Sequence, residues 1–259
     1  MSAFDDLVPL LKKLRLSGLL QTLELRNRQA TEDNLSPCEF LYRVLCDEVE
    51  RRDGKQLDQR LRRASFEHHK TLEDFDFLFN PTVPKSKIVD LATCAYLERH
   101  HNVLLIGPTG TGKSHIAQAL GHRACRAGHT VLYVTAQDLL KQLRAARADA
   151  TYERRLLRFT TPDLLIIDDL GLRPLSGEEP LDLYEIIRQR YERASTLLTS
   201  NRAVEELPAL FGDALLASAA MDRLLHGAHV LVLDGDSYRN PPPDRVRRSP
   251  PKAPQEVAR

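Results

Sequence analysis

The stretch Val103-Leu-Leu-Ile-Gly-Pro-Thr-Gly-Thr-Gly-Lys-Ser-His115 decides the fold of this chain. Its first four residues are apolar and predict a short buried strand, and the glycine-punctuated turn leads into a helix with one apolar face. Gly-x-x-x-x-Gly-Lys-Ser between a strand and a helix is the pattern of a nucleotide-phosphate loop. In such a loop, backbone N–H groups and the helix N-terminus face an anion. The predicted loop residues are Gly107, Pro108, Thr109, Gly110, Thr111, Gly112, Lys113 and Ser114.

The last two residues of this loop carry the predicted cofactor contacts. Lys113 is expected to reach the β- and γ-phosphates of ATP, and Ser114 is expected to bind Mg²⁺. The alternative, a glycine-rich turn without a ligand, is disfavoured because the octapeptide is complete and lies between a strand and a helix.

A second nucleotide signature is the sequence Leu-Leu-Ile-Ile-Asp-Asp at 164–169. An apolar strand that ends in a carboxylate presents it to Mg²⁺ at the carboxyl end of the strand, so Asp168 is a predicted metal ligand. Asp169 is predicted to orient or deprotonate the attacking water. Glutamate is more usual at this position, and the shorter Asp169 leaves the rate of hydrolysis open.

A third polar strand end is Asn201, which follows the apolar stretch that begins at Thr196. In the arrangement typical of additional-strand phosphate-loop ATPases, this strand lies between the phosphate-loop strand and the Asp168 strand. Asn201 would then hold the lytic water near the γ-phosphate. The simpler alternative is an asparagine in a turn.

The remaining elements of the main domain follow from apolar spacing. Strands are expected at 130–135 and 230–233, and helical segments at 137–158 and 203–229. A capping box at Ser176–Glu179 predicts the start of one more helix.

Composition limits the class of protein. The chain has 259 residues, of which 42% are hydrophobic, which suffices for one large core and a smaller module. No apolar run is long enough to span a bilayer, and the four cysteines have no Cys-x-x-Cys spacing. We therefore expect a cytoplasmic protein with reduced thiols and no membrane partner. Because the net charge is only +1, any nucleic-acid contact must come from local basic patches.

Residues 1–70 are predicted to form a small all-helical N-terminal domain. Leucines at helical spacing predict helical structure over 5–29, and the capping box Ser36-Pro-Cys-Glu39 opens a helix that continues past Gly54.

The main domain is predicted to span 71–240. Its first residues, 71–84, form a junction with the helical N-terminal domain. Its three phenylalanines, Phe75, Phe77 and Phe79, are too apolar for a free linker. We expect them to pack on the main domain, where some of them with Asn80 would wall an adenine pocket or simply fill the core.

The helical segment at 137–158 is notably basic. Its candidate DNA-binding residues are Lys141, Arg144, Arg147, Arg154 and Arg155. A surface that follows the DNA backbone and an ordinary solvated face are both consistent with this pattern. Residues 241–259 are proline-rich and basic, and they predict a disordered tail.

The combined motifs resemble the IstB-type transposition helper ATPases, in the initiator and helicase-loader branch of the AAA+ family. The likeness covers about residues 5–240. It is carried by the phosphate loop, Leu-Ile-Ile-Asp-Asp-Leu-Gly at 165–171, Thr-Ser-Asn-Arg at 199–202, Asp-Arg-Leu at 222–224 and Ser-Tyr-Arg at 237–239.

The resemblance implies a three-layer αβα sandwich around a five-stranded parallel sheet, with the helical domain in front. It also implies that Asn201 is the sensor, Arg223 the arginine finger and Arg239 the second sensor arginine. An arginine finger from a neighbouring subunit completes the site, so the resemblance implies a homo-oligomer that assembles with ATP on duplex DNA. The implied protein partner is a cognate transposase that the assembly directs to its target.

Two other functions remain open on the sequence alone. A replicative helicase loader shares the same ATPase core, and the residues of the helical front do not decide between a helicase and a transposase. An ATP-gated assembly scaffold with negligible turnover is a function of another class, and the shortened Asp169 is consistent with it.

Overall fold

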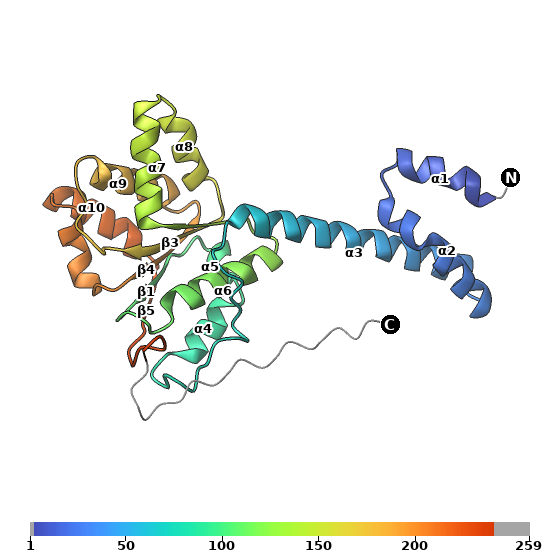
Figure 1. The fold of residues 1–259 in the computed structure, drawn as a ribbon, viewed down its shortest axis with the longest axis horizontal. Coiled ribbons are helices and arrows are strands. Elements are labelled where there is room, and N and C mark those ends of the chain that lie inside the picture. The colour runs from blue at the N-terminus through green and yellow to red at the C-terminus, as the bar shows by residue number, and fades with distance from the viewer. Residues whose placement is uncertain (1–2, 241–259) are drawn as a thin grey trace. The chain divides into compact units, whose positions relative to one another are not determined.

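The computed structural model describes residues 3–240 (Figure 1), so the predicted tail at 241–259 lies outside the described residues. The chain divides into two compact units, Met1–Gln59 and Arg60–Arg259. The larger unit contains one parallel sheet, and the smaller unit is helical.

The sheet has the strand order β2-β3-β4-β1-β5, and each neighbouring pair is parallel. The strands are β1 Val103–Ile106, β2 Val131–Thr135, β3 Leu164–Leu170, β4 Ser195–Ser200 and β5 His229–Val232. The order confirms that β4 lies between the phosphate-loop strand β1 and the Asp168 strand β3. All five strands therefore present their carboxyl ends at one edge, where polar residues from different strands meet.

Helices cover both faces of the sheet, which confirms the three-layer αβα sandwich (Figure 1). One layer contains α7 Ala136–Ala148, α8 Tyr152–Thr160, α9 Glu179–Arg190, α10 Ala214–Leu225 and the 3₁₀ helix η1 Val204–Leu210. The other contains α4 Lys85–Leu91, α5 Ala95–Glu98 and α6 Lys113–Arg126. The central strands are apolar on both faces because each face packs on a helical layer.

Helix α6 packs on the sheet through the apolar face that its sequence predicted. Ile116, Ala117, Leu120 and Ala124 are each at most 1% exposed. Burial of this face fixes α6 directly behind the phosphate loop, so the helix N-terminus points at the loop.

The buried Arg190 fixes the opposite edge of the sheet. Its guanidinium donates to the carbonyls of Pro162 (2.9 Å) and Ser195 (2.5 Å) and to the Thr196 hydroxyl (3.1 Å). Burial lowers the pKa of Arg190 to about 9. These bonds hold the amino ends of β3 and β4 in register, which aligns their carboxyl ends at the site.

Three predicted helical segments are each interrupted in the structure. Residues 5–29 form α1 Ala3–Lys13 and α2 Ser17–Glu32, because Arg15 takes a left-handed conformation with φ of 57°. Residues 137–158 form α7 and α8, because Ala150 has φ of 57° and the Asp149 carboxylate accepts the Thr151 N–H at 3.1 Å.

The segment at 203–229 begins as η1 and becomes α-helical only after Asp213. The Asp213 carboxylate caps α10 by accepting the Leu216 N–H at 2.7 Å. The final strand β5 starts at His229 rather than at Val230. Helices α4 and α5, in the stretch before β1, have no counterpart among the predicted elements.

The smaller unit is built around α1, α2 and the first part of α3, which spans Pro37–Ala64. The capping box predicted at its start is present: the Ser36 N–H donates to the Glu39 carboxylate at 2.9 Å, and the Glu39 N–H donates to the Ser36 hydroxyl at 3.3 Å. A small apolar core joins the three helices and contains Leu11, Leu19, Leu23 and Val44.

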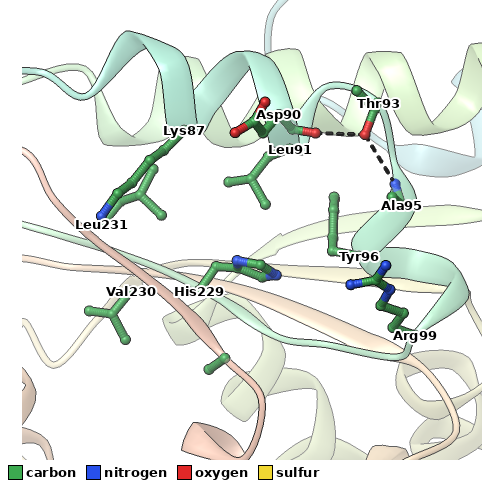
Figure 2. Close-up of a pocket in the computed structure, with 11 residues that line it drawn as sticks. Lys87, Asp90, Leu91, Thr93, Ala95, Tyr96, Arg99, His229, Val230 and Leu231 are labelled. Atoms are coloured by element: carbon green, nitrogen blue, oxygen red, sulfur yellow. Dashed lines mark hydrogen bonds between the residues drawn. The ribbon is translucent and has the colours of Figure 1, made fainter.

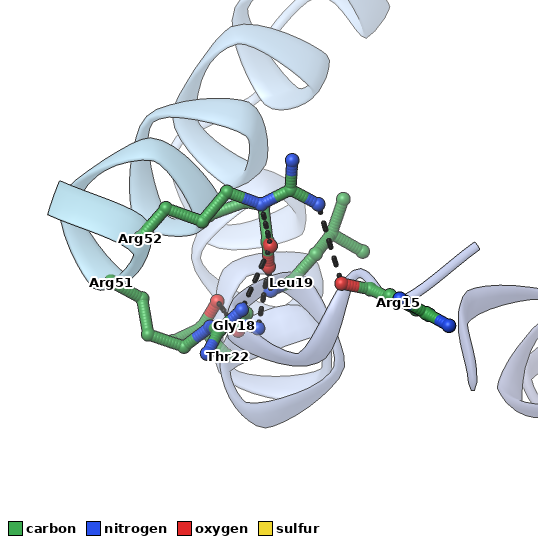
Figure 3. A network of polar contacts seen from close by, with 7 residues as sticks. Arg15, Gly18, Leu19, Thr22, Arg51 and Arg52 are labelled. Carbon is green, nitrogen blue, oxygen red and sulfur yellow. Dashed lines mark hydrogen bonds and ion pairs between the residues drawn. The ribbon is translucent and has the colours of Figure 1, made fainter. Parts of the chain in front are cut away.

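A buried carboxylate, Glu48 of α3, connects α2 and α3. Figure 3 shows the residues around it, including Gly18 and Leu19 of α2 and Arg51 and Arg52 of α3. Glu48 is 3% exposed and accepts the N–H groups of Gly18 at 2.6 Å and Leu19 at 3.2 Å. These are the unpaired donors at the start of α2. Arg51 and Arg52 also donate to the same carboxylate, at 3.0 and 2.6 Å. Burial alone would raise the pKa of Glu48, but these hydrogen bonds outweigh it and lower the pKa to about 2.

Within residues 3–240, no helix is both long and apolar enough to cross a membrane. All four cysteines are free thiols, and Cys94 and Cys125 are buried.

We expect Glu48→Gln to destabilise the smaller unit by about 2 kcal/mol at neutral pH, because it removes a charged acceptor from a buried network. The pKa of Glu48 is lowered on folding, so its stabilisation is complete above about pH 4.5 and is lost as pH falls toward 2. Thermal unfolding followed by circular dichroism between pH 7 and pH 2 measures both effects. Glu24→Gln, at an exposed position of α2, is the matched control. If the two substitutions lowered stability equally, the Glu48 carboxylate would not have the stabilising role described here.

Candidate functional site

The phosphate loop 107–114 connects the end of β1 to the first turn of α6 and holds a buried ammonium group. Lys113 is 5% exposed, and its Nζ donates to the carbonyls of Gly107 and Pro108, both at 2.8 Å. Burial lowers the pKa of Lys113, and the nearby carboxylates of Asp169 and Asp168 oppose that shift. A buried cation that is bonded only to neutral carbonyls is well placed to bind an anion.

Three segments that are distant in sequence pack against glycines of this loop. The carbonyl of Leu233 lies against Gly107, Ser237 lies against Gly110, and the ring of Phe75 lies against Gly112. A Cβ atom at any of the three glycines would clash with its neighbour. The loop is therefore bounded by the end of β5, by the segment after it, and by the junction before α4.

Asp168, at the end of β3, is 3% exposed and accepts hydrogen bonds from three hydroxyl groups. The Ser114 hydroxyl donates to Oδ1 at 3.0 Å, and the Thr199 hydroxyl donates to the same oxygen. The Tyr133 hydroxyl donates to Oδ2 at 2.6 Å. The two residues that the sequence predicts as metal ligands, Ser114 and Asp168, are thus in direct contact.

Asp169 lies at an irregularity in β3, where the register with β4 shifts between Ile167 and Leu170. Its backbone is left-handed, with φ of 57°, and its N–H donates to the Thr199 hydroxyl at 2.9 Å. Such bulges re-aim side chains next to active sites. Burial raises the pKa of Asp169, and Asp168 adds to the shift, while the positive charges of Lys113 and Arg239 oppose it.

The donor set fits Mg²⁺ and a triphosphate. Ser114 and Asp168 offer hard oxygen atoms beside a loop with a buried ammonium, and Mg²⁺ is usually held by one or two carboxylates together with substrate phosphates. In the part of the chain that the structure describes, no cluster of three or more His, Cys, Asp or Glu side chains is arranged to hold a metal alone. The protein atoms are therefore suited to an ion that arrives with a nucleotide.

Arg239 and Asn201 each follow a residue that is hydrogen-bonded to the phosphate loop. The Tyr238 N–H donates to the Gly110 carbonyl at 3.0 Å, so the segment that carries Arg239 is attached to the loop. The charge of Arg239 acts on the pKa values of both Lys113 and Asp169. Asn201 is exposed directly after β4, and its neighbour Ser200 accepts the Gly107 N–H at 3.1 Å.

Arg223 is separate from this group. It lies in the last turn of α10, where its Nη1 donates to the Ala219 carbonyl at 2.8 Å. Its guanidinium lies 5.7 Å from the ring centre of Tyr184 in α9 and 6.0 Å from that of Tyr191. These contacts place Arg223 on the α9–α10 side of the unit and not with the phosphate-loop residues of its own chain.

The predicted basic surface comes from two helices rather than one, and part of it is engaged in ion pairs. Arg144 pairs with Glu179, and Arg147 pairs with Asp182 at 2.5 Å. Glu179 is 3% exposed and Asp182 is 1% exposed, so both arginines neutralise buried carboxylates.

The other basic residues of these helices differ in exposure. Arg155 donates to the Gln142 side chain at 3.4 Å, whereas Lys141 and Arg154 are exposed. Lys141 and Arg154 therefore remain the better candidates for contact with a phosphate backbone.

The aromatic junction packs on the larger unit, as its composition predicted. Phe75 contacts the ring of His115 edge-on, with the ring centres 5.2 Å apart, and Phe79 contacts Tyr238 at 4.9 Å. Asn80 is bonded through its amide to the backbone of Asp236, at 3.0 and 3.2 Å. The junction thus lies against both the loop helix and the segment that carries Arg239.

Tyr133 and Thr199 contact Asp168 but were not among the predicted site residues. Tyr133 lies in β2 and Thr199 in β4, the strands on either side of β3. A hydroxyl group in a buried strand was the available signal, but four of the six residues of β4 carry one, so this signal does not single out Thr199.

A separate cavity of about 480 Å³ lies between α4, α5 and the edge strand β5 (Figure 2). Its polar lining residues include Lys87, Asp90, Tyr96, Arg99 and His229. The lining comes from residues 87–99 and 228–231, so this cavity is distinct from the phosphate loop.

Comparisons with known proteins agree with this geometry. A model of the family of IstB-like ATP-binding proteins matches residues 9–243. A protein of a Mycobacterium tuberculosis insertion sequence, described as ATP-binding, is 40% identical over 230 residues, covering 88% of this chain and 92% of that protein. The protein of Pseudomonas aeruginosa insertion sequence IS21, also described as ATP-binding, is 38% identical over 234 residues, covering 90% of this chain and 88% of that protein.

Solved structures with a similar fold include DnaI and the DnaC helicase loader. DnaI has a TM-score of 0.56 at 21% identity, covering 64% of this chain and 92% of that chain. The DnaC helicase loader has a TM-score of 0.53 at 20% identity, covering 66% of this chain and 97% of that chain. These likenesses show a shared fold.

We expect Gly110→Ala to weaken nucleotide binding and to lower the melting temperature more than Gly128→Ala does. Both glycines have positive φ, 86° and 103°, so both substitutions introduce backbone strain of about 1 kcal/mol. Only at Gly110 would the new Cβ also displace Ser237 and with it the segment that carries Arg239; nothing lies within 4 Å at Gly128. Binding of a fluorescent ATP analogue and thermal melts measure the difference. Equal behaviour of the two variants would show that Ser237 does not constrain the loop.

Proposed function

The chain belongs to the family of IstB-like ATP-binding proteins, and from that premise we propose that it is an ATP-hydrolysing, DNA-binding helper of transposition. The observation that carries this proposal is the convergence of the buried Lys113, the carboxylates of Asp168 and Asp169, and the charge of Arg239 on one loop. A site built only to hold nucleotide has no need of a second, half-buried carboxylate beside the first.

In the proposed mechanism, backbone N–H groups of the loop and Lys113 bind the phosphates, and Ser114 and Asp168 would hold Mg²⁺. When bound, the ion would neutralise negative charge on the phosphate oxygens. Asp169 accepts a proton from the attacking water, and Asn201 orients that water. The raised pKa of Asp169 makes it a better proton acceptor than an ordinary carboxylate near neutral pH.

Arg239 and Arg223 have different proposed roles because they lie in different places. Arg239 lies in a segment that is attached to the chain's own phosphate loop, and it acts there as the second sensor arginine. Arg223 lies on the α9–α10 side and acts as an arginine finger for the next subunit. A head-to-tail interface of this kind is heterologous and generates rings or open helical assemblies. The proposed active form is therefore a homo-oligomer.

The proposed partners are duplex DNA and a transposase. Relatives at 40% and 38% identity are described as ATP-binding proteins of insertion sequences, which supports transposition. The likeness to helicase loaders is lower in sequence and is one of fold, so transposition is the better-supported function. We propose that the helical front, residues 1–70, binds the partner protein and that the assembly works in the cytoplasm.

Mixing two inactive variants tests the shared site. Asp169→Asn should keep nucleotide binding and lose turnover, and Arg223→Ala should lose about a thousandfold in turnover. An equimolar mixture should recover about one quarter of wild-type phosphate release, since half of the sites retain Asp169 and half of those receive Arg223 from a neighbour. The control mixture combines Asp169→Asn with Lys113→Ala, which should not bind nucleotide. In that mixture phosphate release should not recover.

Three outcomes would contradict this scheme. Failure of the Asp169→Asn and Arg223→Ala mixture to recover would remove the finger role from Arg223. Unchanged turnover in Asp169→Asn would remove Asp169 from its role. Wild-type protein that assembles with ATP and DNA yet releases no phosphate would be a scaffold rather than an ATPase.

We expect Lys141→Glu combined with Arg154→Glu to weaken duplex binding and to reduce its dependence on salt. Each lost phosphate contact should lower the slope of log K against log salt by about 0.9. Arg144 and Arg147 are left intact, because each forms an ion pair with a buried carboxylate, Glu179 or Asp182, and reversing their charge would place two negative charges together. The charge-conserving control is Lys141→Arg combined with Arg154→Lys. Unchanged salt dependence in the reversed variant would assign these helices to an ordinary solvated surface.

A further inference from the structure

The carboxylate of Asp168 is held by hydroxyl groups from three different elements. Ser114 belongs to α6, Tyr133 to β2 and Thr199 to β4. The two oxygens are not equivalent: Ser114 and Thr199 share Oδ1, whereas Tyr133 donates to Oδ2. Tyr133 therefore restrains a rotation of the carboxylate that the bonds to Oδ1 alone would leave free.

The phenol of Tyr133 is itself firmly placed. Tyr133 is 4% exposed, and its ring lies 6.3 Å from that of Phe66, which stacks on His122 at 4.5 Å. Its hydroxyl is therefore held at Oδ2 of Asp168, 2.6 Å away.

Thr199 connects the two acidic residues. Its hydroxyl donates to Oδ1 of Asp168 and accepts the N–H of Asp169 at 2.9 Å. One side chain of β4 thus fixes both the orientation of the first carboxylate and the backbone of the second. Its position two residues before Asn201 places it on the same strand end.

We propose that Tyr133 and Thr199 are positioning residues that orient the Asp168 carboxylate toward the Mg²⁺ ion of a bound nucleotide. This inference rests on the proposed function, because it assigns Asp168 to the metal. Ser114 is also a proposed metal ligand, so its hydroxyl cannot serve as a permanent anchor for Asp168. Tyr133 and Thr199 have no other assignment at the site and supply that anchor. Removal of such an outer partner typically lowers metal affinity by about 10- to 100-fold.

The test measures Mg²⁺ dependence rather than turnover. Binding of a fluorescent ADP analogue is titrated with Mg²⁺ and is also measured in EDTA. Tyr133→Phe, which keeps the ring and loses the hydroxyl, should raise the Mg²⁺ concentration at half-maximal effect by about tenfold. Its nucleotide affinity in EDTA should equal that of the wild type. Thr199→Val should shift the midpoint in the same direction, and Thr199→Ser, which retains a hydroxyl, should restore it.

Two controls separate positioning from a loss of general stability. Tyr152→Phe removes a tyrosine hydroxyl that donates to another buried carboxylate, Asp182, at 2.8 Å, and should leave the Mg²⁺ midpoint unchanged. In an Asp168→Asn background, Tyr133→Phe should have no further effect on the midpoint, because the two residues act as a unit.

The possible failures are distinct. Wild-type protein that does not bind nucleotide overturns the proposed function and this inference with it. Nucleotide binding with an unshifted midpoint in Tyr133→Phe overturns the role of Tyr133 alone, as does an equal shift in Tyr152→Phe. If Tyr133→Phe does not fold, the comparison of Thr199→Val with Thr199→Ser decides, and equal midpoints in that pair overturn the inference.

Discussion

The close approach of three distant segments to the phosphate loop is the constraint on which the rest of the structure depends. The Leu233 carbonyl, Ser237 and the Phe75 ring each occupy the space that a side chain would need at one loop glycine. Glycine is therefore required at these positions for packing as well as for the turn around an anion. The same packing brings the segment of Arg239 and the aromatic junction to the loop. The contacts that leave no room for side chains at the three glycines are therefore the same contacts that assemble the site.

The chain that leads into the junction, residues 60–75, follows α6 from its end to its start. Arg60 donates to the Cys125 carbonyl at 3.1 Å near the end of the helix, and the His68 N–H donates to the Gln118 side chain at 3.1 Å. Further toward the helix start, His115 Nε2 lies 2.8 Å from the Thr71 carbonyl. The chain therefore runs antiparallel to α6 until Phe75 reaches Gly112. These contacts are distributed over the helix, so residues 60–75 pack along α6 as far as the phosphate loop.

The sequence predicted those features whose cause is local. Apolar runs and the glycine pattern located the strands, the loop and α6, and hydroxyl and carboxylate spacing located the capping box at Ser36. The breaks at Arg15 and Ala150 were missed because neither residue is one of the usual left-handed types, so tertiary packing and the turn at Asp149 decided them. Tyr133 and Thr199 were missed for a different reason: each is separated from Asp168 by more than thirty residues. Strand order alone brings them together, and a side chain's exact partner does not follow from strand order.

The buried carboxylates of this protein fall into two groups according to their donors. Glu179 and Asp182 are paired with guanidinium groups, so their charge is neutralised within the fold. Asp168 is equally buried, but its hydrogen bonds come from neutral hydroxyls, which satisfy its lone pairs and leave its negative charge in place. A buried charge that is solvated but not neutralised is costly to the folded state unless a cation binds to it. This difference separates Glu179 and Asp182, which are neutralised within the fold, from Asp168, to which the proposed function assigns a metal–nucleotide complex.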